Sequence, residues 1–246
     1  DAKAVASSAD KTFSYIPKLD KSMFRSDADY VYICMNNTIY GTVYHEIPDT
    51  GDIPLIADIS SCFLSEPIDV TKFAMLYGGA QKNVAPAGLT ICIIREDMLG
   101  NARDITPTML NYKIHADANS LYNTPPCYTI YICKLVLEWI EKLGGLEKMK
   151  ERNEKKAKLL YDFLDESQMF KGTVEKKDRS LMNVPFVTGS EEMDAKFIKE
   201  AKEAGFVNLK GHRTVGGMRA SIYNAMPEEG VAKLVEFMKK FEEENA

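Results

Sequence analysis

Residues 73–88 read FAMLYGGAQKNVAPAG, and this stretch indicates the fold class. The apolar run 73–77 has the length and composition of a buried strand in an α/β sheet, and the small residues from Gly78 onward form a loop at its end. Similar short apolar runs, separated by turn residues, occupy positions 30–34, 53–57 and 89–94. The first part of the chain therefore predicts the sheet of an α/β domain.

After residue 122 the chain is predicted to contain helices as well as strands. A helix is expected to start near Asn123, because Asn123 and Thr124 can cap it and the two prolines that follow fit its first turn. A charged, half-exposed helix is expected over 147–167. Strands near 184–187, 206–209 and 219–223 then alternate with helices over 191–204 and from residue 227. We therefore predict two domains: residues 1–145, belonging to a large domain, and residues 146–246, a linking helix with a small α+β domain.

The composition is that of a globular protein, with 246 residues, 45% of them hydrophobic, and a net charge of -5. Acidic and basic residues are interspersed, so no basic stripe predicts nucleic-acid binding. No apolar run approaches the roughly 20 residues of a membrane span, and residues 1–8 read as a short strand rather than as a signal peptide. We expect a cytoplasmic protein whose partners include neither nucleic acid nor a membrane.

The five cysteines are widely scattered, and the three histidines lie far apart in the sequence. An odd number of cysteines without a C-x-x-C pair does not suggest a disulfide framework, and no spacing suggests a metal site. We expect free, buried thiols in a reducing compartment and no bound metal.

Asp58 and Lys82 each follow a predicted strand, where the crevice of an open α/β sheet binds ligands. A lysine among small residues at such a position can attack a carbonyl, and a nearby acid can keep a pyridine nitrogen protonated. The pair therefore suggests a pyridoxal phosphate site. Each residue alone has a plainer explanation, Asp58 as a turn cap and Lys82 as a solvated surface charge.

Cations embedded among glycines form another candidate site over 210–221. Arg219 begins a predicted strand and can clamp a carboxylate through its forked guanidinium, while His212 and Arg213 can meet a phosphate. The alternative is a glycine-rich hairpin with surface cations.

Two polar loops are further candidates. Asn123 and Thr124 stand at a helix start, where free backbone N–H groups can bind an anion, although a plain helix cap is the simpler explanation. Thr38 lies in a polar loop after the predicted strand 30–34, where simple turn formation is the alternative.

Taken together, five segments resemble the phosphoserine aminotransferase family, a branch of the fold type I pyridoxal-phosphate enzymes. They are 57–61 (ADISS), 65–70 (SEPIDV), 79–83 (GAQKN), 122–126 (YNTPP) and the glycine-rich stretch within 211–225. Their order and spacing follow that family. The resemblance implies a partial, mostly parallel sheet of a large cofactor domain, followed by a small C-terminal α+β domain.

The resemblance also implies a role for each cofactor-site residue. Lys82 would hold pyridoxal 5′-phosphate as a Schiff base and move a proton between the substrate Cα and the cofactor. Asp58 would pair with the pyridinium nitrogen. Thr38 would bond the ring oxygen, and Gln81 would reach the cofactor phosphate.

The remaining roles concern the substrate and a second subunit. In this family the residues that match Asn123 and Thr124 complete the phosphate site of the partner subunit, which implies a homodimer with shared active sites. Arg219 resembles the clamp for the substrate α-carboxylate. His212 with Arg213 resembles the group that receives the phosphate or distal carboxylate.

The implied reaction is reversible transfer of the amino group of glutamate to 3-phosphohydroxypyruvate in serine biosynthesis, by a ping-pong route through pyridoxamine phosphate. The resemblance covers nearly the whole chain but lacks roughly the N-terminal third of the family's length. The family's glycine-rich phosphate turn, its ring-stacking aromatic residue and a further His-Arg pair are therefore expected outside these residues. Two alternatives stay open: a non-catalytic fragment that serves only as a dimerising or complementing module, and a fold type I enzyme with another substrate.

Overall fold

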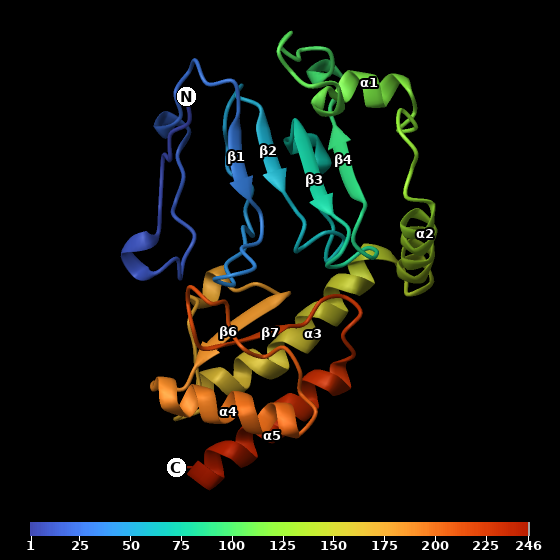
Figure 1. Cartoon of the computed structure of the whole chain (residues 1–246). Coiled ribbons are helices and arrows are strands. Elements are labelled where there is room, and N and C mark those ends of the chain that lie inside the picture. Colours follow the sequence, from blue (N-terminus) through green and yellow to red (C-terminus); the bar gives the residue numbers. More distant parts are fainter. Residues whose placement is uncertain (246) are drawn as a thin grey trace.

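The computed structural model describes residues 1–245 and contains two sheets, one above the other in the view of Figure 1. The strands are β1 Val31–Cys34, β2 Leu55–Asp58, β3 Met75–Gly79, β4 Thr90–Ile94, β5 Lys171–Gly172, β6 Asn183–Val187 and β7 Met218–Ser221. In the first sheet β1, β2 and β3 are parallel and β4 is antiparallel to β3. The second sheet, β5-β6-β7, is antiparallel. The predicted α/β class with a mostly parallel first sheet is confirmed.

The α-helices are α1 Tyr112–Asp117, α2 Cys127–Lys142, α3 Gly145–Glu166, α4 Glu191–Glu203 and α5 Glu228–Asn245. Short 3-10 turns occupy Ala9–Lys11, Lys21–Met23, Val70–Lys72, Glu96–Met98, Thr108–Leu110 and Lys176–Asp178. Figure 1 shows α3 running diagonally behind β6 and β7, with α4 and α5 below it. No helix among residues 1–245 is long and apolar enough to cross a membrane.

Three local predictions are wrong. Residues 206–209 form no strand, and only Lys210 pairs with Met218, as an isolated bridge. Residues 1–8 are not a strand either. The helix expected from Asn123 begins only at Cys127, without a side-chain cap. A residue that precedes proline is disfavoured in helical conformation, and two successive prolines therefore postpone the helix.

Burial corrects the expectation for the cysteines. They form no disulfide within the described residues, but only Cys133 is buried, whereas Cys34, Cys92 and Cys127 are exposed. Cys92 lies on β4, an edge strand that is largely exposed rather than buried as its apolar sequence suggested. An apolar run alone does not reveal whether a strand lies at the centre or at the edge of its sheet.

Each sheet packs against its own hydrophobic core. In the first, alternate positions of β1 and β2 point inward, so Ile33, Leu55 and Ala57 are nearly inaccessible. In the second, phenylalanines meet edge to face, with the ring of Phe197 centred 5.0 Å from that of Phe170 and 5.1 Å from that of Phe241. These geometries are the preferred ones for aromatic pairs. The candidates Asp58 and Arg219 lie on strands of the two different sheets.

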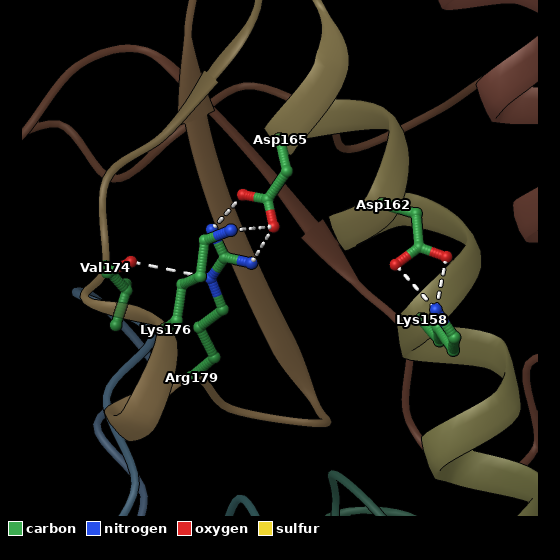
Figure 2. A network of polar contacts seen from close by, with 6 residues as sticks. All are labelled: Lys158, Asp162, Asp165, Val174, Lys176 and Arg179. Atoms are coloured by element: carbon green, nitrogen blue, oxygen red, sulfur yellow. Dashed lines mark hydrogen bonds and ion pairs between the residues drawn. The ribbon is translucent and has the colours of Figure 1, made fainter.

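An ion-pair network joins the end of α3 to the chain that follows β5 (Figure 2). The Asp165 carboxylate accepts from Arg179 at 2.6 and 3.0 Å and pairs with the Lys176 ammonium at 2.9 Å. The Arg179 guanidinium also lies 4.5 Å from the centre of the Tyr161 ring. Hydrogen bonding from Arg179 lowers the pKa of Asp165 to about 2. The forked, partly buried arginine makes this pair stronger than an ordinary surface pair.

Asp165→Asn is expected to lower the free energy of unfolding at pH 7 by about 1 kcal/mol. Because the folded-state pKa is depressed, the ionic stabilisation is present above the unfolded pKa near 3.8 and is lost as the pH falls toward 2. Urea denaturation at pH 7 and at successively lower pH should show the wild type and the variant converging. Asp162→Asn is a matched control, because the Asp162 pair with Lys158 is exposed and should contribute less. A deficit for Asp165→Asn that does not change with pH would contradict the prediction.

Candidate active site

The carboxyl ends of β1, β2 and β3 carry the first set of candidates. Asp58 is the last residue of β2 and pairs in register with Cys34 and Tyr77. Lys82 lies in the loop after β3, and Thr38 lies in the loop after β1. Figure 1 shows the arrowheads of these strands pointing toward the second sheet. Parallel strands thus deliver the three side chains to one edge, where open α/β sheets bind ligands.

Lys82 is half-buried, and its ammonium donates to the Thr38 hydroxyl at 2.8 Å. Its loop is closed by backbone hydrogen bonds, because the Ala80 carbonyl accepts from both Val84 and Ala85 at 2.9 Å. At its start the loop brings the Gln81 side chain back over Gly79, whose Cα would carry a Cβ only 2.7 Å from the Gln81 side-chain oxygen. The Lys82 ammonium is therefore held against Thr38 instead of extending freely into solvent.

Asp58 combines the two explanations considered for it. One carboxylate oxygen accepts from the Ser60 N–H at 2.7 Å and makes the turn expected of a cap. Within residues 1–245 the other oxygen has no hydrogen-bond donor. Burial raises the pKa of the neighbouring Cys34 thiol, the Asp58 charge raises it further, and the Lys82 charge opposes that rise. Asp58 therefore has one oxygen available for a cationic N–H group.

Arg219 reaches the same place from the second sheet. It lies on β7, and its Nη1 donates to the backbone carbonyl of Thr38 at 3.0 Å. Its Nε is buried and has no partner among the described residues. A buried N–H without an acceptor costs free energy, and a carboxylate bound beside it would remove that cost. We name Thr38, Lys82 and Arg219 the Thr38 cluster. Its two hydrogen bonds connect Thr38 to residues that lie 44 and 181 positions away in the sequence.

The other predicted residues lie outside hydrogen-bonding contact with the Thr38 cluster within the described chain. Gln81 is exposed beside Gly79. Asn123 donates to the Thr124 carbonyl, and both residues are exposed ahead of α2. His212 bonds the hydroxyl of Thr214 in a glycine-rich loop whose Arg213 is exposed.

Behind the Thr38 cluster lies a buried polar network that the sequence interpretation missed. The Asn36 amide donates to Ser61 at 2.7 Å and to the Asn183 oxygen at 2.9 Å. The Asn183 amide donates in turn to the Ser221 and Tyr223 hydroxyls, each at 3.2 Å. Burial raises the pKa of Tyr223, so its phenol stays neutral. Single asparagines at unrelated positions carry no sequence pattern that would have revealed this network.

The sequence pattern of the aminotransferase class-V family matches residues 2–234. The chain belongs to that family. A phosphoserine aminotransferase of Bacillus cereus (strain ATCC 10987 / NRS 248) is 55% identical over 245 residues, which cover 100% of this chain and 68% of that protein. The resemblance to this family of enzymes, and the shorter length of the chain, are confirmed.

Solved structures of class-V relatives agree with the fold. The phosphoserine aminotransferase of Bacillus circulans subsp. alkalophilus superposes with a TM-score of 0.96 at 44% identity, over 100% of this chain and 68% of that one. A pyridoxal-phosphate-bound phosphoserine aminotransferase of Trichomonas vaginalis has a TM-score of 0.84 at 40% identity, over 88% of this chain and 61% of that one. The fold type I architecture of this class-V aminotransferase is thus confirmed over the described residues.

Proposed function

We propose that this class-V aminotransferase transfers the amino group of glutamate to 3-phosphohydroxypyruvate and uses pyridoxal 5′-phosphate as its cofactor. The observation that carries the proposal is the Thr38 cluster, in which Lys82 from the first sheet and Arg219 from the second meet on one residue. The relatives at 40–55% identity are phosphoserine aminotransferases, and one of them was solved with pyridoxal phosphate bound, which supports the substrate and the cofactor.

The side chains present fit the cofactor. Lys82 supplies a half-buried primary amine for the covalent link, and the free oxygen of Asp58 suits a pyridinium N–H. The Thr38 hydroxyl suits the ring oxygen, and Gln81 suits the phosphate. When bound, pyridoxal phosphate withdraws electrons from the substrate Cα. The donor set of amine, carboxylate and hydroxyl is the one that this chemistry needs.

The residues of the chain then have distinct tasks. Lys82, directed by the Thr38 hydroxyl, accepts and returns the proton at the substrate Cα, which is general acid-base catalysis. The negative charge of Asp58 keeps a proton on the nitrogen that faces it. Arg219 binds the substrate carboxylate through the Nε–H that the protein leaves unpaired. His212 and Arg213 receive the phosphate. In the ping-pong order, 2-oxoglutarate leaves before the second substrate binds.

Competition between acceptors tests the substrate assignment. With glutamate as donor, equal concentrations of 3-phosphohydroxypyruvate, pyruvate and glyoxylate should yield phosphoserine far ahead of alanine and glycine, because only the first offers a phosphate to His212 and Arg213. Amino-acid analysis after short incubation measures the ratio. Comparable yields of alanine or glycine would contradict the assignment while leaving transamination itself intact.

We also propose a homodimer in which Asn123 and Thr124 serve the partner's site. They are exposed and remain out of hydrogen-bonding contact with the Thr38 cluster of their own chain. Large apolar side chains around them are exposed as well, at 49–71% of their accessible area: Leu121, Tyr122, Tyr128 and Tyr131. An exposed apolar patch of this kind is typical of a protein interface.

Mixing two inactive variants tests this sharing. When Lys82→Ala protein is dissociated and reassociated with an Asn123→Ala/Thr124→Ala double variant, roughly a quarter of the wild-type sites should become intact, because half of the random dimers are hybrids with one complete site. Transaminase activity should rise accordingly. If Asn123 and Thr124 act within their own chain, mixing restores nothing.

A further inference from the structure

A buried amide joint connects the loop of Lys82 to the second sheet. The side-chain oxygen of Asn83 accepts from the backbone N–H of Asn224 at 3.0 Å. Asn83 is 9% exposed and Asn224 is fully buried. A hydrogen bond shielded from water in this way is hard to replace once it is lost.

The Asn224 side chain extends the joint into the neighbouring elements. Its amide donates to the Leu64 carbonyl at 2.9 Å, and its oxygen accepts from the Asn153 amide at 2.9 Å. Asn153, inside α3, also donates to the Ser65 carbonyl at 2.9 Å. Asn224 is thereby fixed from several directions, so it can act as an anchor for Asn83.

The joint lies close in sequence to two members of the Thr38 cluster, Lys82 from the first sheet and Arg219 from the second. Asn83 directly follows Lys82, and Asn224 lies five residues after Arg219, past the end of β7. Between them the Ile222 N–H donates to the Met182 carbonyl at 2.9 Å, which holds the chain after β7 in register up to Ile222. The bond between Asn83 and Asn224 therefore ties the residue that follows Lys82 to the chain segment that follows Arg219.

Separate contacts hold the two sheets together. Asn36 and Asn183 bond across the same junction, and the Ser180 N–H, ahead of β6, donates to the Gly41 carbonyl, after β1, at 2.9 Å. Loss of the bond to Asn83 should therefore leave the junction closed. It should change the local placement of the Lys82 loop instead.

We propose that Asn83 and Asn224 are positioning residues, whose mutual hydrogen bond holds the Lys82 amine at the Cα of a substrate bound to Arg219. This inference rests on the proposed function for its catalytic consequence. Misplacement of a reacting group by about 1 Å can cost roughly 100-fold in rate. A substrate that is still bound by Arg219 would then react slowly without binding weakly.

The test compares Asn83→Ala, which removes the acceptor, with Asn83→Asp, which keeps an acceptor oxygen; both variants lose the contact of the Asn83 side-chain N–H with the Met182 sulfur at 3.4 Å. In the cofactor-free full chain, Asn83→Ala should speed amide hydrogen exchange at Asn224, Val84 and Ala85 by about tenfold, and Asn83→Asp much less. The acetylation rate of Lys82, followed by peptide mass spectrometry, should rise several-fold in the alanine variant alone. Asn101→Ala, at an exposed asparagine, is the control.

The catalytic measurement is the division between kcat and KM. In Asn83→Ala, kcat should fall roughly 10- to 100-fold, with KM for glutamate nearly unchanged, and Asn83→Asp should restore part of the loss. Unchanged exchange and acetylation in Asn83→Ala, or an unchanged kcat in that variant, would overturn the proposal. If Asn83→Ala fails to fold, hydrogen exchange in the wild type still tests the proposal. An Asn224 amide that exchanges as fast as an exposed amide would show that it makes no stable hydrogen bond to Asn83. A wild type without cofactor uptake counts against the proposed function alone, since exchange and acetylation require no cofactor.

Discussion

Lys82→Ala is expected to reduce transamination by at least about 10³-fold, because it removes both the group that links the cofactor and the acid-base that moves the proton. The same variant should lose the visible absorbance of the linked pyridoxal phosphate, and borohydride should no longer fix the cofactor to the peptide that contains residue 82. The fold should persist, since Lys82 contributes one half-buried hydrogen bond, to Thr38.

Lys72→Ala is a suitable control, because Lys72 is exposed in the 3-10 turn that precedes β3. It should retain both the absorbance and the activity. If Lys82→Ala still traps the cofactor and still transaminates, Lys82 is not the linking residue and the proposed function fails with it.

Asp58→Asn is expected to reduce kcat by roughly 10²- to 10³-fold while the covalent link to Lys82 still forms. An asparagine oxygen can keep the turn bond to the Ser60 N–H, so the local backbone should not change. Only the negative charge is lost, and in the proposed function this charge would keep the pyridine nitrogen of the cofactor protonated. Absorbance titration and steady-state kinetics on one preparation separate linkage from turnover.

Asp69→Asn provides the matched control. Asp69 makes the same kind of turn, accepting from the Thr71 N–H, but it lies exposed before β3 and away from the strand ends that carry the site. Its variant should keep full activity. Full activity in Asp58→Asn would instead mean that the turn cap is the whole role of Asp58.

The sequence predicted well those strands whose formation depends mainly on their own residues. The runs that became β1, β2 and β3 are short, apolar and bounded by turn residues, which favours a strand, and the structure moves their limits by one or two residues. The run 206–209 failed, because a strand also needs a partner, and the backbone pairs with β7 only at Lys210. The two-residue β5 was missed, since so short a strand has no periodicity to detect.

For the helices, too, the sequence predicted the local structure but not its packing. The predicted amphipathic helix near 147–167 is confirmed as α3, whose apolar residues pack in the second core. In α2 the periodic residues Tyr128, Tyr131 and Leu135 are instead exposed in the described chain. Periodicity reveals that a helix has an apolar face, but it does not reveal what covers that face.

The sequence by itself determined the α/β class, and it brought Asp58 and Lys82 to the carboxyl edge of one sheet, because an apolar run followed by small residues is a local signal. The tertiary structure alone decided that Thr38 binds Lys82 and Arg219 together, and that Asn83 meets Asn224. Those contacts join residues 44, 181 and 141 positions apart. An asparagine or threonine has the same letter in an exposed turn as in a buried joint, and only the packing of the two sheets excludes water and makes its hydrogen bonds decisive.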